Sequence, residues 1–198
     1  MATQNYAMRA RADEVESRRS AILQAMFALS MEKLTVNITL DDVAERAGVS
    51  VRTVLRQFGS WDGLFAAALE AGKAEILKDR DAPAGDITGA IRGLVNDYEI
   101  RGDWGFRMLA QEDDPRIGVV VANGRTMHRE WVARAFAPYL PKARDEQERL
   151  TDLLVVATDV VSWKLLRRDR GLDRLTTEAR MRDLVTAVLN MNHTTSKE

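Results

Sequence analysis

A short segment near residue 55 carries side chains that could recognise DNA bases. The segment VRTVLRQF, residues 51–58, has the spacing of a helix with two distinct sides. One side carries four polar residues and no acidic one: Arg52, Thr53, Arg56 and Gln57. The other side is apolar: Val51, Val54, Leu55 and Phe58. Arginine can donate two hydrogen bonds to guanine, glutamine can pair with adenine, and threonine can contact a thymine methyl group or a phosphate. The pattern predicts a helix that reads DNA, the alternative being a helical hairpin whose polar side is merely solvated.

The preceding residues carry the signals needed to hold such a helix in place. Thr39 can cap a helix over residues 40–47 because its hydroxyl can accept a backbone N–H three residues later, and Asp42 stands at the return position of a capping box. Gly48 follows where a left-handed residue commonly ends a helix. Ser50 can then cap the second helix. Two short capped helices joined by a glycine turn predict a helix-turn-helix.

Residues 39–58, together with SWDGLF at 60–65, resemble the DNA-binding domain of TetR-family transcriptional regulators. The matching positions are Thr39, the run DDVAERAGVS at 41–50, Thr53 and Phe58. The resemblance implies that double-stranded DNA is a partner. It extends the predicted DNA-contacting set to Thr39, Ser50, Arg52, Thr53, Arg56, Gln57 and Trp61.

Three positions depart from the family pattern. Leu55 stands where the family usually has a tyrosine that contacts a phosphate, and Trp61 stands where it usually has a lysine. Gly59 replaces a frequent proline. The first two departures keep open a ligand-carrying helical dimer that has lost DNA binding.

Composition bounds the class of protein. The chain has 198 residues, 45% of them hydrophobic and 30% charged, and only 4 prolines, which favours a soluble all-α fold. The absence of cysteine excludes disulfides and thiolate metal sites. The net charge of −1 does not itself indicate a nucleic-acid partner. No apolar stretch approaches the roughly 18 residues of a membrane span, so we expect a cytoplasmic protein with no membrane partner.

Catalytic signatures are missing from the sequence. There are only 2 histidines, His128 and His193, and neither has a carboxylate at a spacing that suggests catalysis. No phosphate-binding glycine loop or nucleophile motif is present. We therefore expect no enzymatic activity, no cofactor and no metal site.

About nine helices are expected, four in a DNA-binding domain and five in the remainder. The predicted layout is a flexible basic arm over residues 1–12, a DNA-binding domain over 13–80, a ligand-binding and dimerisation domain over 86–192, and a disordered tail over 193–198. Pro83 and Gly85 mark the boundary between the domains. Within the second domain, RGDWG at 101–105 is expected to break a helix, and residues 144–170 are expected to form one.

A dimer is predicted from the apolar residues 153–166. A helix that is apolar all round must be buried all round, and in a chain of this size one side would meet a partner chain. The TetR resemblance implies the same homodimer, with two reading helices about one DNA turn apart on a palindromic operator. The predicted interface residues are Leu154, Ala157, Val161, Leu165, Leu184 and Val188.

A ligand pocket is predicted in the second domain, where three of the four tryptophans lie. A few polar groups among apolar walls are typical of a pocket, although a polar pair satisfied within the core is the default interpretation of the same pattern. The candidate lining residues are Trp104, Met108, Asn123, Met127, His128, Trp131, Asp159 and Trp163. The sequence thus predicts a repressor released from DNA by a small molecule. The alternative is a regulator or architectural DNA-binding protein with no effector.

Overall fold

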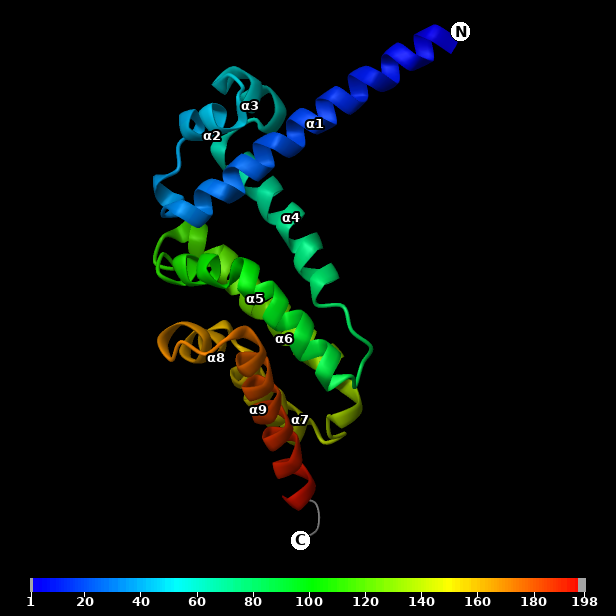
Figure 1. The fold of residues 1–198 in the computed structure, drawn as a ribbon, viewed down its shortest axis with the longest axis vertical. Helices are drawn as coiled ribbons and strands as arrows, with labels where there is room; N and C mark the ends of the chain where they lie inside the picture. Colours follow the sequence, from blue (N-terminus) through cyan, green and yellow to red (C-terminus); the bar gives the residue numbers. More distant parts are fainter. Residues whose placement is uncertain (1, 196–198) are drawn as a thin grey trace. The chain divides into compact units, whose positions relative to one another are not determined.

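The computed structural model describes residues 2–195, and side chains within residues 11–191. These residues form α-helices and short helical turns with no strand, which confirms the predicted all-α class (Figure 1). The chain divides into two compact units, Met1–Glu75 and Ile76–Glu198. Across residues 2–195, no helix is both long enough and apolar enough to cross a bilayer.

The first unit is built on a long helix, α1 (Ala2–Glu32). It is followed by the 3₁₀ turn η1 (Thr35–Asn37), α2 (Leu40–Ala47), α3 (Val51–Phe58) and most of α4 (Trp61–Asp79). The buried core joins all four helices and the turn before α2: Ile22, Ala25, Met26, Leu29, Ile38, Val43, Ala44, Val54, Leu64 and Phe65. This core is what holds α2 and α3 in place.

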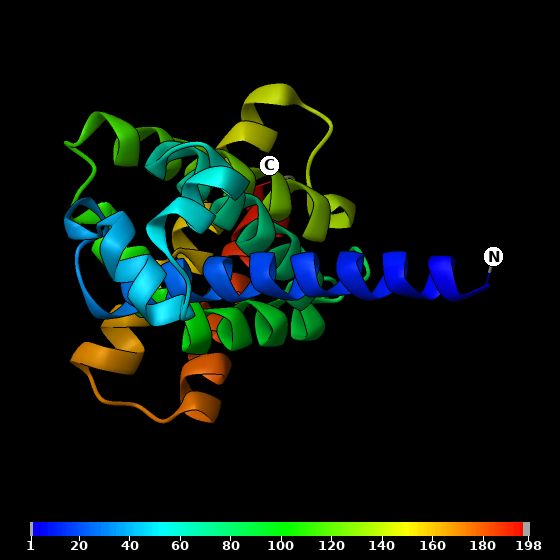
Figure 2. The ribbon, with the colours of Figure 1, turned by 90° about the horizontal axis from the view of Figure 1, so that it is seen from above.

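The N-terminal half of α1 extends beyond the α2–α3 pair (Figure 2). The sequence predicted a flexible arm over residues 1–12, whereas the structure continues α1 back to Ala2. Neither glycine nor proline occurs before Gly48, so nothing in this segment stops a helix. Arg11 is exposed, and the side chain of Arg9 lies outside those described.

The second unit packs five helices around a separate core. They are α5 (Ile87–Leu109), α6 (Pro115–Ala135), α7 (Arg144–Thr158), α8 (Val160–Lys164) and α9 (Arg174–Thr195). The 3₁₀ turn η2 (Ala137–Tyr139) follows α6, and the π-helical turn η3 (Leu165–Asp169) follows α8. Helix α5 packs against α6, α8 and α9, and α7 packs against α6 and α9. Of the tail predicted at 193–198, residues up to Thr195 belong to α9, and 196–198 lie outside the described residues.

The predicted helix break at residues 101–105 is wrong, because α5 runs through it. Gly102 is there for close packing: a Cβ atom at this position would lie 2.4 Å from the nearest ring carbon of Trp163. At Gly105 a Cβ atom would meet Val160 at 3.8 Å. The two glycines therefore form a notch in α5 for α8, which a rule based on local propensity reads as a helix end.

The single helix predicted over 144–170 is also wrong, because it is interrupted at Asp159. This residue is extended, with φ −66° and ψ 151°, and its carboxylate accepts a hydrogen bond from Val161 N at 2.8 Å. Asp159 is thus the N-cap of α8 rather than a polar group on a continuous apolar helix. The π turn η3 then changes the helical register before Gly171.

Candidate DNA-reading surface and the buried cluster of the second unit

The predicted caps of α2 and α3 are present in the structure. Thr39 N donates to Asp42 Oδ2 at 2.7 Å, and Asp42 N donates to Thr39 Oγ1 at 3.1 Å, which completes the capping box. The hydrogen bond from Lys33, together with those from Thr39, holds the pKa of Asp42 well below its usual range. Gly48 takes φ 66°, and Ser50 Oγ accepts from Thr53 N at 3.2 Å. The start of both helices is therefore fixed by local hydrogen bonds.

The exposed side of α3 is centred on its two arginines. Arg52 and Arg56 are exposed, and Val54 is fully buried beneath them. Within residues 11–191 neither arginine makes an ion pair, so both guanidinium groups are free to contact DNA. Thr53 is half-buried, and its hydroxyl lies 2.9 Å from Ser50 Oγ.

Two residues of α3 differ in solvent exposure from what the sequence predicted. Leu55, assigned to the buried side, is 40% exposed. Gln57, assigned to the polar side, is half-buried, and its Oε1 atom is buried without a hydrogen-bond partner in the structure. Because α3 is only eight residues long, neighbouring helices decide how far each flank is covered. The exposed strip is therefore Arg52, Leu55 and Arg56.

Trp61 has a structural contact at the start of α4. Its indole N–H donates to Ile38 O at 2.8 Å, and its ring centroid lies 5.0 Å from that of Phe65. The hydrogen bond ties the first turn of α4 to the residue before the cap of α2. Sequence reasoning placed Trp61 at a DNA-contacting position, but only the fold shows that its N–H is already engaged.

Two contacts that the sequence did not reveal brace α1 against the helix-turn-helix. Arg46 of α2 makes a two-pronged ion pair with Glu32 of α1, at 2.9 and 2.7 Å. The guanidinium of Arg19 lies 4.8 Å above the ring centroid of Phe58, a favourable cation–π distance. Both pairs are too far apart in sequence for local spacing to predict them.

A buried ionic cluster in the second unit contains one of the predicted ligand-binding residues. Arg80 Nε donates to Asp97 Oδ2 at 2.7 Å, and Arg101 Nη1 donates to Asp97 Oδ1 at 2.5 Å and to Asp79 Oδ2 at 2.8 Å. Arg80 Nη1 lies 3.3 Å from His128 Nδ1. We define this set, Asp79, Arg80, Asp97, Arg101 and His128, as the ionic cluster.

His128 is neutral in this cluster. Burial, reinforced by the positive charge of Arg80, lowers the pKa of His128 to about 3. Its Nε2 atom lies 3.0 Å from Thr158 Oγ1, whose own hydroxyl donates to Leu154 O at 2.7 Å. Since that hydroxyl proton is engaged, we assign the imidazole proton to Nε2, which leaves Nδ1 to accept from Arg80. The polar groups of His128 are thus satisfied inside the protein.

The other candidate ligand residues are scattered among several environments. Trp131 stacks on His128 with a centroid separation of 5.5 Å and donates to Arg80 O at 3.2 Å. Trp163 is completely buried and donates to Glu99 Oε1 at 3.1 Å. Met108 is buried, Trp104, Met127 and Asp159 are half-buried, and Asn123 is exposed. The structure therefore brings His128 and Trp131 together but does not gather the whole set.

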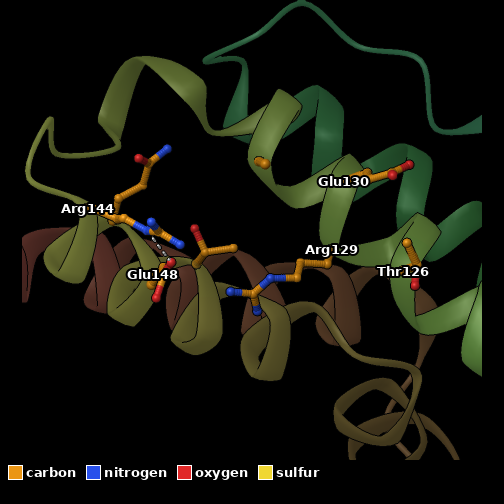
Figure 3. A pocket seen from close by; sticks show the side chains of 8 residues that line it. Thr126, Arg129, Glu130, Arg144 and Glu148 are labelled. Carbon is orange, nitrogen blue, oxygen red and sulfur yellow. Dashed lines mark hydrogen bonds and ion pairs between the residues drawn. The ribbon is translucent and has the colours of Figure 1, made fainter.

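An open groove lies between α6 and α7, with a volume of about 590 Å³ (Figure 3). None of the predicted ligand-binding residues lines it. Seven of its eight lining residues have polar side chains, and an ion pair joins Arg144 to Glu148 at 3.0 Å. The lining residues are Thr126, Arg129, Glu130, Ala133, Arg144, Gln147, Glu148 and Thr151. Among the described residues, no cluster of His, Cys, Asp and Glu could hold a metal ion.

The predicted dimer residues divide into two groups. Leu154, Ala157 and Val188 are buried in the core of the second unit. Val161, Leu165 and Leu184 are 43%, 56% and 43% exposed. Val156, near the C-terminal end of α7, is 66% exposed and was not on the predicted list.

The capped helix-turn-helix, with two free arginines on its second helix, defines the first unit as a helix-turn-helix DNA-binding domain. Residues 22–68 match the family model described as bacterial regulatory proteins, tetR family. This match shows a TetR-family DNA-binding domain at residues 22–68, which confirms the resemblance seen in the sequence and supports a DNA-binding transcriptional regulator.

A solved structure shares the fold over most of the chain. The crystal structure of a transcriptional regulator from Rhodococcus sp. Rha1 matches with a TM-score of 0.66 and 17% sequence identity, covering 87% of this chain and 96% of that one. At this identity the similarity shows a shared fold. No curated protein sequence matches the chain.

Proposed function

We propose that the protein is a homodimeric repressor that binds a palindromic operator and is released from it by a small molecule. Residues 13–80 would bind DNA, and residues 86–192 would dimerise and respond to the effector. The observation that carries the proposal is the pair of free, exposed arginines on α3, because a recognition helix needs unengaged donors to read bases.

Dimerisation is supported by exposed apolar side chains on consecutive elements of the second unit. Val156 on α7, Val161 on α8 and Leu165 on η3 are all exposed, and Leu184 is exposed on α9. Helices α7 and α9 pack against each other, so Val156 and Leu184 lie on two neighbouring helices. A second copy of the same surface would bury them in an isologous interface.

The effector site is proposed among the candidate residues of the second unit, centred on His128 and Trp131. Since His128, Trp131 and Trp163 already satisfy their polar groups, an effector must replace these hydrogen bonds and shift the surrounding helices. Release then follows if the effector prefers the shifted arrangement. The internal pairing of these three side chains is the observation that supports the alternative, a regulator without an effector.

Selection of bound duplexes from a random DNA pool, with and without cell extract, tests the proposal. We expect a palindromic sequence to be enriched, and the enrichment to fall when extract supplies the effector. Enrichment of a palindrome that no extract reverses would favour the effector-free alternative. Recovery of no defined sequence would contradict the operator proposal.

Replacing Arg52 or Arg56 by alanine should weaken binding to the selected operator by about 1–3 kcal/mol if that residue contacts a base. Specificity should then relax at one position of each half-site. A residue that contacts only phosphate should instead weaken all sequences alike and flatten the salt dependence. Titration of labelled duplexes measures both effects, and Arg144→Ala, an exposed arginine of the second unit, is the control. Unchanged selectivity in the Arg52→Ala, Arg56→Ala double variant would contradict the assignment.

Val161→Glu should yield monomers, because an unpaired carboxylate buried in the interface costs about 3–5 kcal/mol. Operator affinity should fall with it, since two half-sites no longer act together. Sedimentation velocity measures the assembly state. The matched control is Val119→Glu, an exposed valine of α6 that is outside the proposed interface. Wild-type protein that sediments as a folded monomer at micromolar concentration would contradict the dimer.

A further inference from the structure

Leu55 occupies an unusual place for an exposed leucine. Single exposed apolar residues are ordinary on protein surfaces and usually need no explanation. Leu55, however, lies on the same exposed strip of α3 as Arg52, three residues before it, and Arg56, directly after it. At about 100° per residue the three side chains fall within an arc of roughly 100°. A large apolar side chain therefore stands beside the two arginines proposed to read the operator.

The core of the first unit does not account for this leucine. The apolar side of α3 is supplied by Val54, which is fully buried, and by Val51 and Phe58, which are half-buried. Leu55 is 40% exposed and offers no hydrogen-bond donor to a phosphate. What it can gain on binding DNA is apolar contact.

The major groove offers one apolar group that differs between base pairs, the 5-methyl group of thymine. We infer that Leu55 is a specificity-determining residue that packs against the 5-methyl group of a thymine next to the bases contacted by Arg52 and Arg56. This inference rests on the proposed operator binding and adds to it a requirement for thymine at one position of each half-site. The two arginines position α3 by charge and hydrogen bonding. Leu55 adds an apolar contact with the thymine methyl group, which neither arginine can make.

Thymine-to-uracil substitution tests the inference, because it removes the methyl group and preserves base pairing. The probe is the selected operator duplex, with deoxyuridine placed at each thymine in turn. For wild-type protein we expect one position at which uracil weakens binding about fourfold, the factor associated with one methyl group leaving apolar contact. Changing both half-sites should weaken binding roughly 15-fold.

The Leu55→Ala variant should bind the thymine and uracil duplexes equally. The control is Leu34→Ala, since Leu34 is 41% exposed in the same unit but lies before η1 rather than on α3. This variant should keep the full preference for thymine, and melting curves of both variants should match the wild type. Leu55→Tyr should bind at least as tightly as wild type through an added phosphate contact, but without the methyl preference.

Two results would overturn the inference while leaving operator binding intact. One is wild-type protein that binds every uracil-substituted duplex as well as the parent duplex. The other is an equal loss on uracil for wild type and Leu55→Ala, because another residue would then read the methyl group. Failure to select any defined operator is a different result, and it would overturn the proposed function together with the inference.

Discussion

Replacing Asp97 by alanine is expected to destabilise the second unit by about 3–5 kcal/mol, the cost of leaving a buried charge without its partner. Asp97 is 1% exposed, and its two oxygens accept from Arg80 and Arg101. Its removal leaves the guanidinium groups of Arg80 and Arg101 in a buried site without the carboxylate that they share, although Asp79 still pairs with Arg101. Chemical denaturation followed by tryptophan fluorescence measures the loss, since Trp131 lies beside Arg80.

The control for Asp97→Ala is Glu148→Ala, which removes an exposed ion pair with Arg144. Exposed pairs contribute about 0–1 kcal/mol, so this variant should unfold almost as the wild type does. Each variant removes one carboxylate, but only that of Asp97 is buried. The loss in unfolding free energy should therefore be several-fold larger for Asp97→Ala than for Glu148→Ala. A loss below 1 kcal/mol for Asp97→Ala would show that water enters the ionic cluster and that its charges are not desolvated.

Replacing Trp163 by alanine should destabilise the second unit by about 3–5 kcal/mol, as expected for truncating a buried tryptophan. The ring is completely buried, fits the notch at Gly102, and lies 5.8 Å from the ring of Tyr98. Its indole N–H donates a hydrogen bond to the Glu99 carboxylate, and Arg167 donates to the same carboxylate at 2.9 and 3.1 Å. Thermal melting measures the loss. A wild-type melting temperature combined with loss of effector release would show instead that Trp163 lines a ligand site.

Gly102→Ala provides a paired test of the same contact. A methyl group there would lie 2.4 Å from the ring of Trp163, so the ring must move at a cost of about 1–3 kcal/mol. In the Trp163→Ala background the clash is gone, and the better helix propensity of alanine should make the substitution neutral or stabilising by about 1 kcal/mol. Strong non-additivity between the two changes is therefore expected. Additive effects would contradict the notch.

The sequence by itself determined the features that depend on neighbours along the chain. The capping box of Thr39 and Asp42, the left-handed Gly48 and the cap at Ser50 all use hydrogen bonds or backbone angles within a few residues. The two arginines of α3 follow from helical periodicity. Local spacing was enough to predict the helix-turn-helix, and the family model confirmed its class.

Only the tertiary structure decided which residues on these helices are covered. Leu55 and Gln57 exchanged their predicted environments because neighbouring helices shield the flanks of α3 unequally. Gly102 was predicted to end a helix, yet it accommodates a ring from 61 positions later in the chain. His128 needed a partner, but Arg80 is 48 residues away in sequence and Thr158 is 30. Such contacts depend on how the helices pack, and helical periodicity specifies which side of a helix is apolar without specifying what will cover it.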